Sequence, residues 1–234
     1  MFKYILSLLL LMSVSLFADT KEALEAFKKK DYEKAFKLYE KSAIAGDTTA
    51  QNALSYLYLN GIGVLKDTKK GINWLEKAAN SSDARAQNDL GMMYLTGQNV
   101  AQDSKNAFKW LKKASDAKNQ NAQYNLALMY YRGDGADQNV TRASELLEDS
   151  ALQGNEQAIK NIGLVYMQLL KFDKAAEWLE KNAQMGDERA YYLLAEIYCT
   201  NENFEKAKKW AKKSKDSGNK DAELLWLKYN LEKY

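Results

Sequence analysis

The fold is decided by a stretch that covers residues 86–121 and reads AQNDLGMMYLTGQNVAQDSKNAFKWLKKASDAKNQN. Its second half carries small or apolar residues at Ala107, Phe108, Leu111 and Ala114, which is the spacing of one face of an amphipathic helix. The first half shows the same kind of spacing and ends at a glycine and an asparagine, residues that tolerate the positive φ of a turn. The stretch therefore predicts two helices joined by a loop.

The same helix pair recurs along the chain at fixed spacing. One column of alanines is spaced by 36, 36, 36, 32 and 32 residues, at Ala50, Ala86, Ala122, Ala158, Ala190 and Ala222. A second column of small residues keeps the same five spacings, at Ala35, Gly71, Ala107, Ala143, Ala175 and Ala207. Two columns with one spacing indicate tandem repeats, in which each pair buries its apolar face against its neighbours.

Other small residues and the tryptophans share this register. A third column, which predicts close approach of paired helices, is formed by Ser55, Gly91, Ala127, Gly163 and Ala195. Four tryptophans lie three residues after the second column, at Trp74, Trp110, Trp178 and Trp210. Their shared phase favours a packing role over a ligand site, and Trp226 is the exception.

Three segments carry a resemblance to a known family. Residues 54–64, 90–97 and 126–135 each place a tyrosine four residues after a leucine and a glycine three residues later. They resemble Sel1-like repeats, a family with a 36-residue pattern. The units at 155–186 and 187–218 lack four residues of the inner loop and are more similar to tetratricopeptide repeats, as is the first unit. The short turns read Phe172-Asp-Lys-Ala175, Phe204-Glu-Lys-Ala207 and Tyr32-Glu-Lys-Ala35.

The repeats and the resemblance predict an all-α fold, an α-solenoid of six antiparallel helix pairs with a C-terminal cap. The pairs are expected at 19–46, 47–82, 83–118, 119–154, 155–186 and 187–218. A last helix over about 220–233, within a cap at 219–234, is expected to face solvent because Lys228, Glu232 and Lys233 are charged. Residues 19–234 are expected to form a single domain without an internal linker.

The composition limits the kinds of catalytic and metal-binding site that the chain can form. The 234 residues include no proline and no histidine; average usage of roughly 5% would give about twelve prolines, and a chain made of helix interiors explains their absence. Without histidine, and with Cys199 as the single cysteine, the chain lacks the residues of Ser-His-Asp and Cys-His catalysis and of zinc or iron–sulfur sites. We therefore expect no cofactor and no metal, whereas carboxylate-based and Ser/Lys-based chemistry stays open.

The charge is close to balanced. The chain has 34 Lys and Arg against 31 Asp and Glu, a net charge of +3. Nucleic-acid binding would require clustered basic surface. The lysine run at 28–30 is followed closely by acidic residues and indicates a solvated helix face. No nucleic-acid partner is expected.

The N-terminus has the features of an export signal. A short basic start, an apolar run from Tyr4 to Phe17 and the small residue Ala18 precede Asp19. The run is shorter than the roughly 20 residues that span a bilayer and matches a cleaved secretory signal. Residues 1–18 are expected to be removed, leaving no membrane span and a periplasmic or secreted protein of a Gram-negative bacterium. An uncleaved membrane anchor is the alternative.

Binding is the function that the resemblance implies. In tetratricopeptide-like solenoids the first helix of each pair lines a concave surface that holds an extended peptide or a partner helix. Carried onto this chain, the register gives one lining row at Asn52, Asn88, Tyr124, Lys160 and Tyr192, and a second at Tyr56, Met92, Leu128, Leu164 and Glu196. Asn amides can bond to a ligand main chain, while Tyr and Met supply adaptable contact area. We expect an exported scaffold or adaptor for a protein or peptide partner.

A hydrolase is the alternative from another class. Some cysteine-rich Sel1-repeat proteins are described as penicillin-binding proteins or β-lactamases, and serine β-lactamases use a Ser-x-x-Lys element. This chain contains Ser115-Asp-Ala-Lys118 and Ser217-Gly-Asn-Lys220, but no Ser-Asp-Asn or Lys-Thr-Gly element. It also lacks the paired cysteines of those relatives. Both matches fall at the ends of repeat helices, as expected of chance occurrences, so no catalytic residue is assigned.

Cys199 lies near the end of the first helix expected in the unit 187–218. The structural interpretation is an inert, partly buried thiol. The alternative is a redox-active thiol or an intermolecular disulfide, since an unpaired cysteine in an exported protein can serve either role.

A compact motif surrounds Asn139. The residues Asp137-Gln-Asn139-Val-Thr141 fit the acidic-x-Asn-x-Ser/Thr acceptor of bacterial N-glycosylation, in a loop expected to be exposed. The structural alternative is a loop followed by the start of a helix. Asn139 is therefore a candidate glycosylation site.

Overall fold

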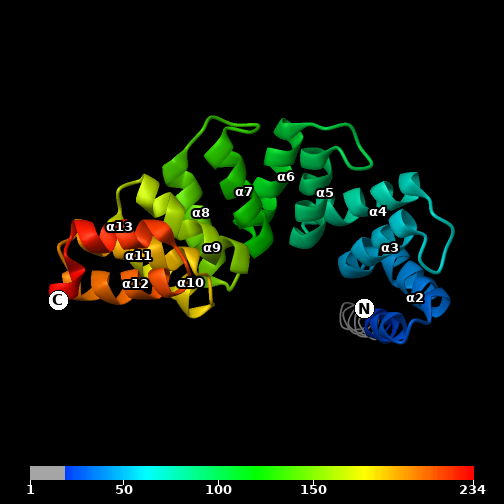
Figure 1. Cartoon of the computed structure of the whole chain (residues 1–234). Helices are drawn as coiled ribbons and strands as arrows, with labels where there is room; N and C mark the ends of the chain where they lie inside the picture. Colours follow the sequence, from blue (N-terminus) through cyan, green and yellow to red (C-terminus); the bar gives the residue numbers. More distant parts are fainter. Residues whose placement is uncertain (1–18) are drawn as a thin grey trace, which may run out of the picture. The chain divides into compact units, whose positions relative to one another are not determined.

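The computed structural model describes residues 19–234, and these residues form helices and turns without a β-strand (Figure 1). The all-α prediction is confirmed. The export signal predicted at 1–18 lies outside the described residues.

The helices follow one another as antiparallel pairs at the predicted positions. After a helix over residues 19–28, the chain forms α2 (Tyr32–Ile44), α3 (Thr48–Asn60), α4 (Thr68–Asn80), α5 (Ala84–Thr96), α6 (Ser104–Asp116), α7 (Gln120–Arg132) and α8 (Val140–Leu152). It continues with α9 (Glu156–Gln168), α10 (Phe172–Gln184), α11 (Arg189–Thr200), α12 (Phe204–Asp216), α13 (Lys220–Lys228) and the 3₁₀ turn η1 (Leu231–Lys233). The predicted succession of helix pairs with a capping helix is confirmed.

The chain divides into two compact units. One contains the described part of Met1–Ala122 with Asp134–Ala136, and the other contains Gln123–Gly133 with Asp137–Tyr234. Within the first unit α3 packs on α4 and α5 on α6; within the second, α9 packs on α10 and α11 on α12. Each unit is described by itself below.

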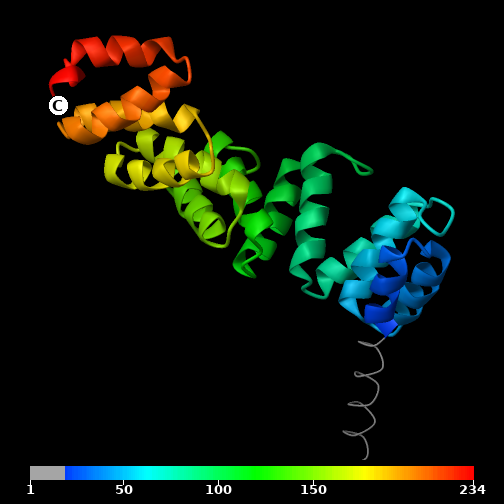
Figure 2. The ribbon, with the colours of Figure 1, turned by 60° about the horizontal axis from the view of Figure 1, so that its bottom comes forward.

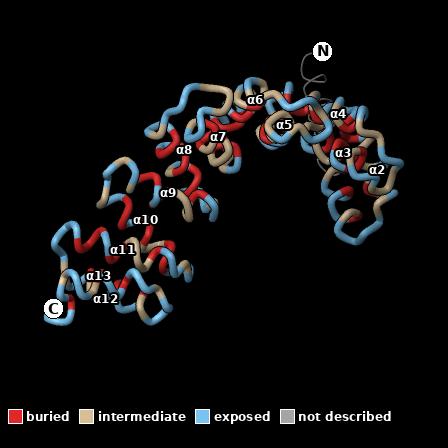
Figure 3. Tube along the Cα trace, turned by 45° about the horizontal axis from the view of Figure 1, so that its top comes forward, coloured by how far each residue is buried: buried red, intermediate tan, exposed pale blue. Residues whose placement is uncertain are grey.

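The repeat columns form the core of both units. The alanines of the first two columns are buried, and Figure 3 shows buried and exposed residues alternating along each helix, as the helical period requires. A Cβ atom added at Gly91 would lie 2.7 Å from Cγ of Leu111, and one at Gly163 would lie 2.8 Å from Cγ of Leu179. The third column therefore lets a leucine of the second helix sit against the backbone of the first.

Side-chain caps start most of the helices. Asp47 and Asp83 accept from the backbone N–H groups of Ala50 and Ala86, three residues further on, at 3.0 Å each. Such caps satisfy N–H groups that have no partner within the helix. The α-helices α10 and α11 of the second unit are exceptions, because Lys171 and Glu188 occupy their N-cap positions and provide no side-chain bond.

The C-terminal cap differs from its prediction in two respects. The helix expected to reach 233 ends at Lys228, because Asn230 adopts a left-handed conformation with φ of 48° and directs the chain back, so that Leu231 becomes buried. The surface expected to be charged also includes Leu224 and Leu227, which are 66% and 67% exposed.

Candidate functional site

A groove of about 660 Å³ opens in the N-terminal unit, among the helix at 19–28, α3 and α5. It is lined by Thr20, Lys21, Leu24, Phe27, Tyr39, Asp47, Thr49, Asn52, Ala53, Tyr56, Leu57, Arg85 and Asp89. Asn52 and Tyr56 belong to the two predicted lining rows. Thr20 and Leu24 lie 32 residues before them and occupy the same register, so extending the short repeat by one unit would have identified both.

The floor of the groove is apolar and aromatic. Leu24 is 44% exposed and Tyr56 is 52% exposed, unusually high fractions for large apolar side chains beside a core. The ring of Phe27 meets that of Tyr56 edge-on, with centroids 6.4 Å apart, and contacts Tyr32 in the same way at 5.4 Å. Edge-to-face pairs of this kind stabilise ring orientation. The groove therefore presents a preformed apolar surface.

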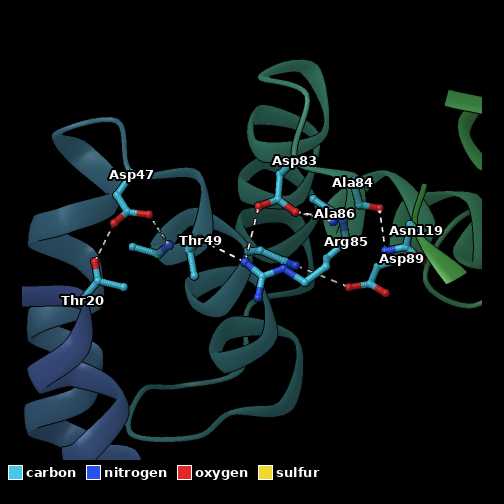
Figure 4. A network of polar contacts seen from close by, with 11 residues as sticks. Thr20, Asp47, Thr49, Asp83, Ala84, Arg85, Ala86, Asp89 and Asn119 are labelled. Atoms are coloured by element: carbon cyan, nitrogen blue, oxygen red, sulfur yellow. Dashed lines mark hydrogen bonds and ion pairs between the residues drawn. The ribbon is translucent and has the colours of Figure 1, made fainter. Parts of the chain in front are cut away.

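Polar side chains form one rim of the groove (Figure 4). The Thr20 hydroxyl donates to Asp47 Oδ2 at 2.7 Å, while Oδ1 of the same carboxylate caps α3. Arg85 Nη2 donates to Thr49 Oγ1 at 3.0 Å and lies 3.7 Å from Asp83 Oδ2. These contacts join the first helices of successive repeats and hold a guanidinium group beside the groove.

Asp89 provides a carboxylate on the same surface. Its Oδ2 accepts from Asn52 Nδ2 at 3.5 Å and its Oδ1 accepts from Asn88 Nδ2 at 3.2 Å. Burial raises the pKa of Asp89 above its ordinary value, while the bonds from Asn88 and Asn52 act in the opposite direction. Asp89 therefore offers an acceptor whose negative charge a cationic or N–H-bearing ligand would stabilise.

A second hollow of about 330 Å³ adjoins the groove and shares Asn52, Tyr56 and Asp89 with it. Met93 lines this hollow, whereas the predicted Met92 is half-buried and does not line it. The predicted Asn88 is only 8% exposed, so little of its surface is available to a ligand.

The remaining lining candidates belong to the C-terminal unit. Four of them are half-buried, namely Tyr124, Leu128, Lys160 and Tyr192. The other two, Leu164 and Glu196, are exposed. The hydroxyl oxygen of Tyr124 accepts from Asn161 Nδ2 at 3.0 Å, one repeat further on. Burial is the first cause of a raised pKa at Tyr192. These positions stay predictions as binding residues.

The two Ser-x-x-Lys matches lie at helix ends. Ser115 is buried near the end of α6, and its carbonyl accepts from the N–H of Lys118, which adopts a positive φ of 62°. Ser217 is exposed, and its hydroxyl donates to the carbonyl of Ser214 at 3.0 Å. Both serines thus take part in the turns that end second helices.

Cys199 is buried on α11, with 3% of its surface exposed. Burial raises the pKa of its thiol above the usual value, and the nearby Lys228 opposes this only in part. The raised pKa disfavours the thiolate, which is the nucleophilic form. The burial of Cys199 and its raised pKa favour the interpretation as an inert thiol over that as a redox-active thiol.

Asn139 is exposed and begins α8. Its Oδ1 accepts from the N–H of Arg142 at 2.8 Å, and its own N–H donates to the carbonyl of Tyr130 at 2.8 Å. The residue therefore has the helix-start role that the structural alternative assigns to it. Glycosylation at Asn139 stays a prediction, and the intact mass of protein from its natural host would test it.

Residues 19–234 lack two further features. No cluster of three or more Cys, Asp or Glu side chains there is arranged to hold a metal ion. Nor does any helix in that range combine the length and the apolar character needed to cross a bilayer.

Tandem helix pairs with a ligand-sized groove define a repeat scaffold, a class typical of protein–protein interaction and typically non-catalytic. The particular family follows from the sequence pattern. The Sel1 repeat model matches residues 26–47, 48–83, 84–119, 120–155, 169–187 and 188–219, so the chain belongs to the Sel1 repeat family. The match omits α9, where the 32-residue units begin.

Solved structures support this membership. The protective antigen c5321 of uropathogenic Escherichia coli, described as displaying an SLR fold, is 29% identical over 88% of this chain, with a TM-score of 0.74. The chain spans about half of that antigen, 47% of its length. A Sel1 repeat protein from Oxalobacter formigenes is 28% identical over 87% of both chains, with a TM-score of 0.72. No protein with a curated description matches the sequence.

A more distant similarity concerns the fold alone. YrrB, described as a TPR protein with an unusual peptide-binding site, is 19% identical. The similarity covers 82% of this chain and 97% of YrrB, with a TM-score of 0.53.

Proposed function

We propose that this protein is an exported scaffold that holds an extended segment of a partner protein in the groove of its N-terminal unit. The observation that carries the proposal is the pair of exposed side chains, Leu24 and Tyr56, on a groove of about 660 Å³. Large apolar groups that face a concave surface mark a binding site rather than ordinary surface.

The rim supports a peptide as the ligand. An extended peptide presents alternating main-chain donors and acceptors, and the groove offers both kinds of partner. Arg85 and Lys21 provide donors, and Asp89 provides an acceptor. The apolar floor between them suits one or two aliphatic or aromatic side chains of the ligand. Tyr56 and Arg85 belong to the residue types that most often contribute strongly at interfaces.

Photocrosslinking in cells tests the groove. Tyr56 is replaced by p-benzoyl-phenylalanine, cells are irradiated, and adducts are identified by mass spectrometry. The control position is Leu65, which is 89% exposed and does not line the groove. We expect a defined protein adduct from position 56 that position 65 does not give. The same adducts at both positions, or none at position 56, would contradict the proposal.

Export is the second part of the proposal. It is supported by the signal-like sequence at 1–18 and by similarity to an Escherichia coli protein described as a protective antigen. Protein recovered from the periplasm or the medium should begin at Asp19 on N-terminal sequencing. Recovery of chains that begin at Met1 in the cytoplasm would refute it.

A further inference from the structure

Asp89 lies where the groove of the N-terminal unit meets the adjoining hollow, and it lines both. Two side-chain amides hold its carboxylate, since Oδ1 accepts from Asn88 Nδ2 at 3.2 Å and Oδ2 accepts from Asn52 Nδ2 at 3.5 Å. Asn88 is buried, so the group that binds Oδ1 is itself held in place. Asp89 thus presents a carboxylate of defined orientation at the junction of the two hollows.

Asp89 has no ion-pair partner within residues 19–234. Arg85 lies one turn earlier on α5, but its Nη2 donates to Thr49 Oγ1 at 3.0 Å and lies 3.7 Å from Asp83 Oδ2. Burial is the first cause of the raised pKa of Asp89, because the charged carboxylate has lost part of its solvation. A cation of the ligand would restore that stabilisation.

The hollow of about 330 Å³ beside Asp89 offers further acceptors, and Asp89 is the only carboxylate among the residues that line it. Ser55 also lines this hollow; it is 1% exposed, and its Oγ has no hydrogen-bond partner among the described residues. The Asn60 amide donates to the carbonyl of Tyr56 at 2.8 Å, which leaves the Asn60 Oδ1 as an acceptor. A guanidinium group carries five N–H donors and no acceptor, and therefore matches these oxygens better than an ammonium group does.

Lys66 is the one cation that lines the hollow, and it is held differently from Asp89. It lies in the loop between α3 and α4, which Figure 2 shows in cyan at the ends of the two helices. The residue is exposed, so its long side chain can direct the ammonium group into solvent. The charge that is fixed at the hollow is therefore negative.

We propose that the N-terminal unit selects partner segments in which an arginine lies within two positions of a large apolar residue. The apolar residue lies on Leu24 and Tyr56, and the guanidinium group enters the hollow and pairs with Asp89. The spacing follows because Tyr56 lines both hollows, and an extended chain advances roughly 3.3–3.6 Å per residue. This inference rests on the proposed function and specifies which peptides the groove accepts.

Peptide selection tests the preference for arginine. A phage library of random nonapeptides is panned against the purified protein over residues 19–234 and, in parallel, against Tyr56→Ala, which identifies binders outside the groove. We expect the peptides that require Tyr56 to be enriched in arginine within two positions of Leu, Phe or Tyr. The net charge of the chain is positive and would by itself attract acidic peptides, so it does not account for such an enrichment.

A double-mutant cycle then tests Asp89 as the residue that binds the arginine. The most enriched peptide is labelled with fluorescein, and its twin carries citrulline, which has nearly the shape of arginine but no charge. Fluorescence anisotropy measures both peptides against the unaltered protein and against Asp89→Asn, Lys66→Ala and Asp137→Asn. Asp137 is exposed, lines neither hollow and serves as the control. Circular dichroism verifies that every variant is folded.

We expect Asp89→Asn to weaken the arginine peptide by about tenfold or more and the citrulline peptide by less than about twofold. Lys66→Ala should strengthen the arginine peptide, because it removes a competing positive charge, and Asp137→Asn should change neither peptide. The inference fails if Asp89→Asn weakens both peptides equally or if Lys66→Ala weakens the arginine peptide. Enrichment of acidic or purely apolar peptides that require Tyr56 would also overturn it, while the proposed function would stand. If no peptide requires Tyr56, the proposed function fails and this inference fails with it.

Discussion

The 36-residue units within residues 47–154 and the 32-residue units within 155–218 pack their helices alike but turn the chain differently. The contact of Gly91 with Leu111 in a long unit has the same geometry as that of Gly163 with Leu179 in a short one. The inner turns differ: Gly61 and Gly63 adopt φ of 67° and 68° in a long unit, whereas Leu170 takes φ of 56° in a short one. The repeat columns therefore determine helix packing, and the inner loop is a separable element.

The largest expected effect concerns the long loop. A Cβ atom at Gly63 would collide with the carbonyl oxygen of Tyr32 in the preceding repeat, and the backbone is left-handed there. Gly63→Ala should lower the free energy of unfolding by about 3 kcal/mol, from the combined cost of overpacking and of positive φ. Urea denaturation measures it. Gly46→Ala, at a glycine with φ of 100° and open space around it, is the control. Equal losses in the two variants would show that the loop does not pack on the preceding repeat.

Substitution of the glycine at a helix crossing should lower the free energy of unfolding equally in the 36-residue and the 32-residue units. Gly91→Ala and Gly163→Ala each force a buried leucine to move, since the added Cβ would lie within 3 Å of its Cγ. Each should cost about 2 kcal/mol, and the two values should agree within about 1 kcal/mol. Chemical denaturation of the two variants in parallel provides the comparison. A large loss in only one of them would break the claim that the crossings are equivalent.

Alkaline pH should lower the free energy of unfolding through Tyr166 of the C-terminal unit. Burial, then a hydrogen bond with Glu148, raises the pKa of Tyr166 to about 12, from an ordinary value of 10. Because the folded-state pKa is the higher one, its stabilising contribution is complete below pH 10 and is lost as pH rises towards 12. Two pKa units correspond to roughly 3 kcal/mol in all, of which about 1.4 kcal/mol should be lost by pH 11.

Urea midpoints at pH 9 and pH 11 measure this contribution. Tyr166→Phe should unfold with a smaller change between the two pH values than the unaltered protein shows. An identical pH dependence in the two proteins would exclude Tyr166 as the titrating group.

The smallest expected effect is a gain in the short units. The N-cap residue of α10 is Lys171, which forms no side-chain cap, whereas the N-cap residue of α6 is Asp103, which accepts from the N–H of Asn106 at 3.0 Å. Lys171→Asp should raise the free energy of unfolding by about 1 kcal/mol. Lys171→Ala serves as the control for loss of the lysine itself. If both variants have the same thermal midpoint, the cap is not what distinguishes these helix starts.

The sequence predicted the helix pairs because spacing alone carries that information. Two columns of small residues establish the period, and their burial follows from it. The end of α13 was not predictable in this way, since it depends on Asn230 adopting a left-handed backbone while Leu231 enters the core. Local periodicity contains no signal for that reversal.

The groove was predictable in part. Asn52 and Tyr56 followed from register, and Thr20 and Leu24 would have followed had the register been extended towards the N-terminus. Arg85 and Asp89 reach the groove through contacts with the neighbouring repeat, at Thr49 and Asn52. Such contacts depend on side-chain length and direction in three dimensions. The burial of Asn88 has the same origin.

The central claim is that the groove of the N-terminal unit binds the partner. It is tested most directly by measuring the affinity of the partner recovered by crosslinking for variants at one register position, which can be compared between the N-terminal and the C-terminal unit. Tyr56 in the N-terminal unit and Leu164 in the C-terminal unit occupy that position, and both are about half exposed. We predict that Tyr56→Ala weakens binding by at least about tenfold, while Leu164→Ala changes it by less than twofold. Unchanged affinity for Tyr56→Ala in a folded protein would contradict the assignment of the groove as the binding site.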